Sequence, residues 1–336
     1  MANARGASGL SLVVGVDKPS GMTSHDVVNA CRRIYGERRV GHTGTLDPLA
    51  TGVLPICIGP ATRLDQYLVG HDKSYDARIA FGAATDTFDA MGSITETASV
   101  PSEVGEARVA RACLASMVGF QLQIPPSHSA IKVAGKKAYE LARAGQEIKL
   151  EPREVTVYDA GLVDISFDEE TGYVNWDVAF TVSSGTYIRA LARDLGTMLS
   201  CPAHIASLRR TRVGSLGIED CHALGSLEEC QKGVALDPVE LLGFRVAFAK
   251  GEAKSKLENG NPLDSGDVEL FVLHDATYEE RMDACSSLLS SADIPPVDGE
   301  PISIVCDGSL KAIYAYDAAQ GRFNAKTIFS VGVSRG

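Results

Sequence analysis

Strands are predicted wherever apolar and polar residues alternate along the chain. Between residues 73 and 81, Tyr75, Ala77, Ile79 and Phe81 occupy every second position. This is the period of a strand with one buried face. Short apolar or alternating runs predict further strands at 11–17, 53–58, 155–165, 174–182 and 204–214.

Helices are predicted where apolar residues recur at helical spacing behind a capping signal. Thr23 and Asp26 resemble a capping box, so a helix is expected to begin there. Other helical patterns cover 61–69, 103–118, about 136–144, the stretch ending near 199, and fragments of 220–242. If residues 183–189, which lead into the helix ending near 199, are extended, Tyr187 and Arg189 point to one side.

The chain beyond about residue 245 predicts a small β-rich domain. Short strands are expected at 246–248, 267–272, 302–306, 311–316 and 325–331, separated by Gly, Asp and Pro. The stretch from about 274 to 300 interrupts this pattern and is interpreted as an insertion. Residues 1–10 are small and polar, so a disordered tail is expected.

Charge is distributed unevenly over the 336 residues. The net charge is −11, and residues 213–336 hold 20 acidic and 10 basic side chains, so residues 1–212 are close to neutral. An anionic polymer responds to local field and not to net charge. The near-neutral part holds three basic clusters that predict phosphate contacts: Arg32, Arg33, Arg38 and Arg39; Lys132, Lys136, Lys137 and Arg143; and Arg209, Arg210 and Arg212.

Cysteine usage and hydropathy indicate the compartment. The eight cysteines form no C-x-x-C pair and no metal-binding spacing, which is typical of free thiols in a reducing compartment. No apolar run approaches the length of a membrane span, and the apolar run at 12–16 is too short for a signal peptide. We expect a cytoplasmic protein.

A glycine-rich loop at residues 41–52 carries the candidate chemistry. Asp47 is its only carboxylate, and Pro48 disfavours the α conformation for Asp47. Two interpretations of this pattern stay open from spacing alone. The loop presents a nucleophile or base beside His42, or Asp47 and Pro48 simply start a turn.

Seven motifs in order give the chain a specific resemblance. The motifs are Asp17-Lys18-Pro19-x-Gly21-Met22-Thr23-Ser24, the Gly41–Gly52 loop, Lys73-Ser74-Tyr75, Asp86-Thr87-x-Asp89-x-x-Gly92, Pro125-Pro126-x-x-Ser129-Ala130-x-Lys132, Gly185-Thr186-Tyr187-Ile188-Arg189 and Leu208-Arg209-Arg210-Thr211-x-x-Gly214. Together they resemble the bacterial B-type family of tRNA pseudouridine synthases.

The resemblance implies an α+β pseudouridine synthase fold with a central antiparallel sheet. It implies a catalytic domain at 11–244 with a thumb insertion at about 125–150, followed by a PUA-like domain at 245–336. It also implies Asp47 as catalytic aspartate, Arg189 as its ion-pair partner, and Tyr75 as the residue that packs on the base. The substrate-binding residues expected from the motifs and basic clusters are His42, Tyr187, Leu208, Lys18, Lys132, Arg209 and Arg210.

The implied activity is isomerisation of uridine 55 in the T-arm of tRNA, with no cofactor and no metal. A carboxylate can act at C1′ or C6, or remove a proton at C2′, and the sequence leaves these routes open. The target base must leave its stack, and an aromatic face then supports it. We expect a monomer that needs no guide RNA. The competing hypothesis is a non-catalytic tRNA-binding or RNA-folding module, for which Asp47 would be dispensable.

Overall fold

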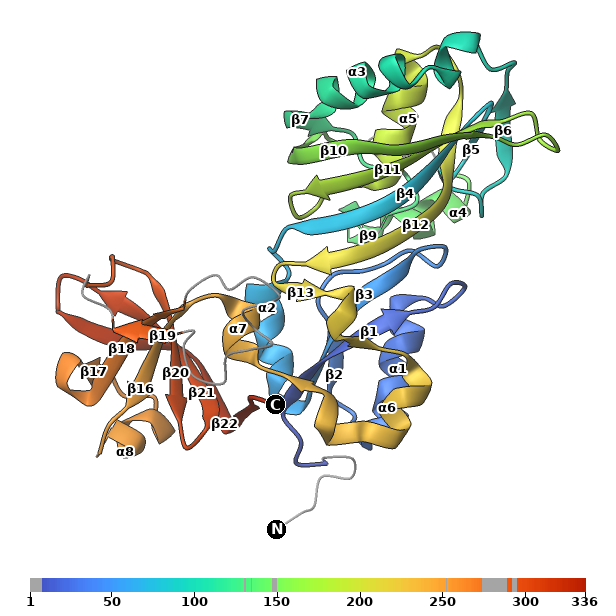
Figure 1. Cartoon of the computed structure of the whole chain (residues 1–336). Coiled ribbons are helices and arrows are strands. Elements are labelled where there is room, and N and C mark those ends of the chain that lie inside the picture. The colour runs from blue at the N-terminus through green and yellow to red at the C-terminus, as the bar shows by residue number, and fades with distance from the viewer. Residues whose placement is uncertain are drawn as a thin grey trace.

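The computed structural model describes residues 8–129, 131–133, 135–146, 150–251, 253–273, 289–291 and 295–336. Two sheets dominate it, and they lie side by side in Figure 1. The larger sheet runs in the order β14-β1-β3-β12-β4-β11-β10-β7. Its strands are β14 (Cys221–His222), β1 (Leu12–Lys18), β3 (Thr51–Ile58), β12 (Ala203–Val213), β4 (Lys73–Phe81), β11 (Val174–Val182), β10 (Arg153–Phe167) and β7 (Gly119–Gln123), with β2 (Val40–His42), β13 (Leu216–Gly217) and β15 (Ala235–Leu236) attached beside this path.

The larger sheet is mainly antiparallel, as expected, but it contains two parallel pairs. Strand β1 runs parallel to β14, and β3 runs parallel to β12. The second pair matters for the site because Arg209 lies opposite Thr51 and Arg210 lies opposite Gly52. The loop before β3 is thereby placed against the basic end of β12.

Helices cover this sheet where the apolar periodicity predicted them. Helix α1 (Ser24–Tyr35) begins with the expected capping box of Thr23 and Asp26. The other described α-helices of this part are α2 (Asp65–Leu68), which follows a 3₁₀ turn at Gly59–Leu64, α3 (Ala107–Met117), α4 (Ala138–Arg143), α5 (Ile188–Met198), α6 (Leu224–Cys230) and α7 (Pro238–Leu242). One further helix, α8 (Ala253–Glu258), was not predicted and packs in the core of the C-terminal part.

One sequence prediction about this region was wrong. The lead-in at 183–189 is not an extended segment that places Tyr187 and Arg189 on one side. Tyr187 is the N-cap of α5, so Arg189 lies in the first helical turn. Arg189 nevertheless points into the site, as described below, because the helix starts beside the Asp47 loop.

The predicted thumb at 125–150 forms a small hairpin and a helix between β7 and β10. The hairpin consists of β8 (Lys132–Val133) and β9 (Lys136–Lys137), and α4 follows it directly. The side chains of Lys132, Lys136, Lys137 and Arg143 lie outside the described part of the structure. Their predicted phosphate contacts therefore stay predictions.

The second sheet forms the β-rich C-terminal part, at the left of Figure 1. Its order is β17-β22-β21-β20-β16-β18-β19. These strands are β17 (Leu263–Asp264), β22 (Arg322–Ser334), β21 (Ser309–Asp317), β20 (Pro301–Cys306), β16 (Arg245–Ala249), β18 (Val268–Leu273) and β19 (Leu289–Ser291). Most of the predicted insertion at 274–300, and residues 1–7 of the predicted tail, lie outside the described residues.

An apolar cluster joins the two sheets. Val13 and Cys57 of the larger sheet share it with Val246, Ile313 and Phe329 of the smaller one. The opposite side chains of β1, such as Val14, face a different cluster beneath α1. Strand β1 is thus buried on both faces, which explains its unbroken apolar run. The domain boundary near 245 stays a prediction.

Candidate active site

Asp47 lies on the loop between β2 and β3, and buried hydrogen bonds fix that loop. The Ser24 hydroxyl, at the start of α1, accepts from the Leu46 amide at 2.8 Å and donates to the Leu46 carbonyl at 3.1 Å. The Ala50 amide donates to the Asp47 carbonyl at 3.1 Å, which closes a turn. Because Leu46 and the Asp47 carbonyl are both anchored, the Asp47 carboxylate has few alternative positions.

Lys18, which was expected to bind substrate, lies inside the fold and supports the same loop. Its side chain is fully buried. The ammonium donates to the carbonyls of Pro19 at 2.8 Å, Met22 at 2.7 Å and Pro48 at 3.4 Å. Burial lowers the pKa of Lys18 to about 8, although the nearby Asp47 carboxylate opposes that change. A side chain held in this way has no route to a phosphate.

Arg210, also expected to bind substrate, is buried in the same way. Only 1% of it is exposed. Its Nε donates to the Val53 carbonyl at 2.7 Å and its Nη2 to the Gly44 carbonyl at 3.1 Å. Gly52 lies against its backbone with φ of +100°, and a Cβ there would approach the Arg210 carbonyl oxygen to 2.1 Å. Arg210 and Gly52 therefore fix the conformation of the loop.

Arg189 reaches Asp47 from the first turn of α5. Its Nη2 donates to Asp47 Oδ1 at 3.0 Å, and its Nε lies 2.9 Å from Asp47 Oδ2. The guanidinium also donates to the carbonyls of Thr87 at 2.8 Å and His128 at 3.0 Å. Arg189 is 4% exposed, so these contacts are made with little competition from water.

Asp89 is a second carboxylate beside Arg189, and sequence reasoning did not assign it to the site. Its Oδ2 lies 3.7 Å from Arg189 Nε, and its Oδ1 accepts from the Thr87 hydroxyl at 2.7 Å and the Met91 amide at 3.0 Å. The turn is fixed on β12 because Ala90 donates to the Ile205 carbonyl at 2.8 Å. The only signal in the sequence was the Asp86–Gly92 motif itself.

The electrostatics of Asp47 reflect these opposing neighbours. Burial raises the pKa of the Asp47 carboxyl above its ordinary value, the Arg189 guanidinium works against that rise, and the Asp89 carboxylate adds to it. The Asp47 side chain is still 36% exposed. The carboxylate is accordingly reachable from solvent, while two buried cations, Arg189 and to a smaller extent Lys18, stabilise its ionised form.

Tyr75 and Leu208 lie on the two adjacent strands that face this loop. In the β4–β12 register, Tyr75 lies opposite Arg210 and Leu208 lies opposite Ala77. Both side chains belong to the apolar cluster that also contains Leu46 of the loop, and they are 8% and 7% exposed. Together with Leu46 they make up the apolar side of the site.

Tyr187 is placed by a buried glutamine that sequence reasoning missed. The Gln123 side chain accepts from the Tyr187 amide at 2.9 Å and donates to its carbonyl at 3.2 Å. Gln123 is 2% exposed. Burial raises the pKa of the Tyr187 phenol, so the hydroxyl stays protonated at neutral pH.

His42 and Arg209 flank the loop at its two ends. His42 pairs with Ile56 on β3. Burial lowers the pKa of its imidazole, and the Arg210 charge adds to this, while Asp65 acts in the opposite direction. Arg209 is partly exposed and donates to Asp17 at 2.8 Å and 3.1 Å. Of the two arginines in this motif, Arg209 is the one that solvent can reach.

Within the described residues, no group of three or more His, Cys, Asp or Glu side chains is placed to hold a metal ion. In the same part of the chain, no helix has both the length and the apolar character needed to cross a membrane.

The fold and this site define an RNA-modifying class, the pseudouridine synthases. Among solved structures, an H/ACA RNP bound to a substrate RNA containing 2′-deoxyuridine shares the fold, with a TM-score of 0.65 and 21% identity over 95% of this chain and 84% of that one. The Nop10–Cbf5 complex of an archaeal box H/ACA sRNP gives a TM-score of 0.64. The expected α+β pseudouridine synthase fold is confirmed.

Sequence comparison narrows the class to one family. The N-terminal domain model of TruB family pseudouridylate synthases matches residues 32–188, and the C-terminal domain model of tRNA pseudouridylate synthase B matches 189–239. The chain belongs to the TruB family of pseudouridylate synthases. Relatives called tRNA pseudouridine synthase B include those of Mycobacterium sp. (strain KMS), 46% identical over 72% of this chain and 81% of the relative, and Caldanaerobacter subterraneus subsp. tengcongensis, 46% identical over 74% and 84%.

Proposed function

We propose that this protein converts uridine 55 in the T-arm of tRNA to pseudouridine, with Asp47 as the catalytic aspartate. Membership of the TruB family and the names of the relatives support the tRNA substrate. The observation that carries the role of Asp47 is its ion pair with the buried Arg189 beside an apolar surface. The position of the target uridine follows from the family resemblance.

The reaction breaks the bond between C1′ and N1 of uracil and joins C1′ to C5. C5 then loses its proton, and N1 takes up a proton from solvent, so the product is an isomer of uridine. Asp47 must be ionised to attack C1′ or C6 or to remove a proton from C2′, and Arg189 keeps that charge in place as burial opposes it. Tyr75 packs on the flipped base and is our candidate for moving the C5 proton. Leu208 and Tyr187 border the same pocket, and His42 engages the flipped nucleotide.

A tritium-release assay tests both the activity and the role of Asp47. The substrate is an unmodified tRNA transcript labelled at C5 of uridine, and a transcript with cytidine at position 55 controls for the site. Wild type is expected to release tritium from the first transcript only. Asp47→Asn should release none while it binds the RNA in a gel-shift assay, whereas Asp164→Asn, an exposed aspartate on β10, should behave like wild type.

The outcomes separate the proposal from its rival. Equal release by wild type and Asp47→Asn would remove this carboxylate from the mechanism. Tight binding by wild type without any release would favour a tRNA-binding or RNA-folding module.

We further propose that the protein acts as a cytoplasmic monomer without a guide RNA. The thumb-like segment at 125–150 supports this, since it would clamp the stem-loop that a guide complex would otherwise hold. The described cysteines are free, which fits a reducing compartment. Light scattering on the purified protein tests whether it is a monomer. An isomerisation assay that contains only the protein and its tRNA substrate tests whether a guide RNA or a second protein is needed. A dimer, or a requirement for a second component, would contradict it.

A further inference from the structure

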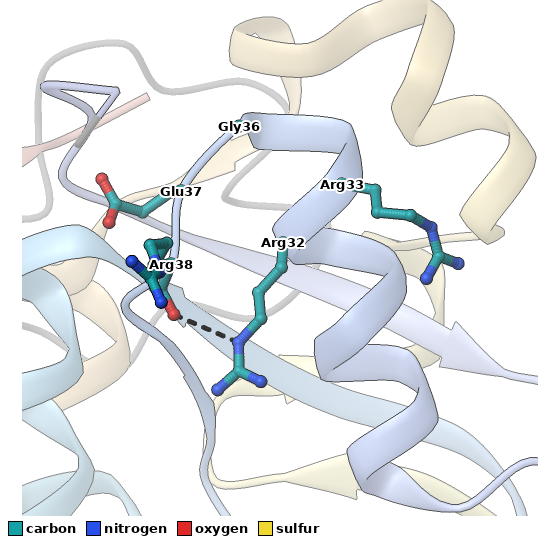
Figure 2. Close-up of a pocket in the computed structure, with 5 residues that line it drawn as sticks. All are labelled: Arg32, Arg33, Gly36, Glu37 and Arg38. Carbon is teal, nitrogen blue, oxygen red and sulfur yellow. Dashed lines mark hydrogen bonds between the residues drawn. The ribbon is translucent and has the colours of Figure 1, made fainter. Parts of the chain in front are cut away.

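Four arginines gather at the C-terminal end of α1, in the shallow pocket drawn in Figure 2 and beside it. Arg33, Arg38 and Arg39 are exposed and Arg32 is half-buried. Figure 2 shows Arg32 and Arg38 on one side of the turn and Arg33 on the other side of the helix. We call these four residues the α1 arginine cluster. Within the described part of the chain, none of the four forms an ion pair with a carboxylate.

The one acidic residue in this segment, Glu37, lines the same pocket but is held by other partners. Glu37 is 6% exposed. One of its carboxylate oxygens accepts from the Ser8 amide at 3.0 Å and the Ser8 hydroxyl at 3.1 Å, and the other accepts from the Arg39 amide at 3.0 Å. The carboxylate is therefore hydrogen-bonded by neutral donors and forms no ion pair with the cluster in the described structure, so four guanidinium charges lie beside a single negative charge.

Local contacts also orient the cluster outward. Arg32 Nε donates to the Arg38 carbonyl at 3.1 Å, and its Nη1 donates to Asn29 Oδ1 at 2.9 Å.

The helix ends at Gly36, which has a φ of 60° and would have open space around a Cβ. The last carbonyls of the helix accept from the Gly36 and Glu37 amides, so the negative helix end is largely covered.

This chemistry fits a nucleic-acid backbone better than a protein surface. Guanidinium groups match phosphate geometry with paired N–H donors. A protein-binding patch would carry an apolar or aromatic centre. None of the large apolar side chains exposed in the described structure comes from residues 29–39.

The position of the cluster relates it to the proposed reaction site. The N-terminal end of α1 holds the Asp47 loop through Ser24 and Leu46, and the cluster lies at the other end of the same helix. Twelve helical residues span about 18 Å. We propose that the α1 arginine cluster binds backbone phosphates of the substrate RNA at about this distance from the reacting uridine. This inference rests on the proposed function and adds a second contact to it.

A paired charge reversal tests the inference. Arg33→Glu and Arg38→Glu are combined, because neither side chain makes a hydrogen bond in the described structure. The matched control combines Arg108→Glu and Arg111→Glu, two exposed positions on α3, and so makes the same change in net charge. Each protein is assayed for binding and isomerisation with full-length tRNA and with a hairpin trimmed to its loop and a short closing stem.

With full-length tRNA we expect the paired variant to bind roughly tenfold more weakly, and the slope of log affinity against log salt to fall by about two. Its kcat at saturating tRNA, and its affinity for the trimmed hairpin, should match those of wild type and of the α3 control. The inference would be overturned if the paired variant bound tRNA as tightly as wild type does. It would also be overturned if the paired variant lost as much affinity for the trimmed hairpin as for tRNA, or if the α3 control lost as much affinity for tRNA as the paired variant. A wild type that binds tRNA but forms no pseudouridine would defeat the proposed function, whereas the binding comparison would still test the cluster.

Discussion

Arg189 Nη2 donates to Asp47 Oδ1 at 3.0 Å, although 142 positions separate the two residues in the chain. The two side chains differ in exposure to solvent: 5% of the Arg189 side chain and 36% of the Asp47 side chain are exposed. The guanidinium is also held by the Thr87 and His128 carbonyls. A fixed cation thus meets a carboxylate that a substrate can reach, an arrangement suited to electrostatic preorganisation.

Replacing Arg189 by glutamine should lower kcat by about a hundredfold or more at neutral pH, as loss of a preorganised donor does elsewhere. Because Arg189 opposes the raised pKa of Asp47, its loss should move the acid limb of the pH–kcat profile to higher pH. Arg78→Gln is the matched control, since Arg78 forms a two-point pair with Asp177 on the sheet away from the site. An unshifted acid limb would mean that Arg189 does not control the ionisation of Asp47.

Replacing Asp89 by asparagine should move the acid limb of the pH–kcat profile to lower pH. The Asp89 carboxylate contributes to the raised pKa of Asp47, so a neutral amide should lower that pKa and extend activity to lower pH. The asparagine oxygen can still accept from Thr87 and Met91, so the turn should persist. The measurement is kcat across the acid range, as for Arg189. A limb that moved upward would show that the main role of Asp89 is to hold Arg189.

The fold was largely predictable, whereas the site was predictable only through the family motifs. The alternation from Tyr75 to Phe81 arises because one face of that strand is buried, and such a pattern can be recognised within the strand itself. The structure has β4 at the predicted residues. The contact between Asp47 and Arg189 depends on two elements far apart in sequence. Spacing alone left the turn interpretation of Asp47 open, and the ordered motifs were needed to choose.

The sequence did not show that two of the basic residues are buried. The family motifs and the basic clusters made Lys18 and Arg210 candidates for substrate binding, and basic residues are seldom buried. In the fold, the glycines and prolines of the Asp47 region leave backbone carbonyls without strand partners, and these two side chains satisfy them. A sequence shows the charge of a residue but not the carbonyl groups that surround it. Asp89 was missed because its partner Arg189 lies on a helix far from it in the sequence, and the sequence does not show that the two meet.

Lys18 should leave a signature in the pH dependence of stability. The folded protein releases this proton near pH 8, and the unfolded chain keeps it up to about 10.5. Between these values the unfolded state binds more protons, so the contribution of Lys18 to the free energy of unfolding increases with pH. The advantage of wild type over Lys18→Met should therefore grow from pH 7 to pH 10, by up to about 3 kcal/mol.

Urea denaturation at both pH values measures this change. The comparison with Lys18→Met cancels the buried cysteines, such as Cys57, whose raised pKa acts in the opposite direction. Lys250→Met, at an exposed position, should show no such growth. A constant difference between wild type and Lys18→Met would contradict the lowered pKa.

Gly52→Ala tests whether the loop geometry itself is required. Gly52 has a φ of +100°, and an added Cβ would lie 2.1 Å from the Arg210 carbonyl oxygen, which belongs to the backbone of β12 and cannot move aside as a side chain can. We expect a loss of about 3 kcal/mol or more in the free energy of unfolding, together with loss of isomerisation, because the strand that follows Asp47 must separate from β12. Gly70→Ala is the control, since a Cβ there meets no atom within 4 Å and the backbone is not left-handed. It should be neutral or slightly stabilising. If Gly52→Ala were as stable and active as Gly70→Ala, the close packing of the loop on β12 would not be what positions Asp47.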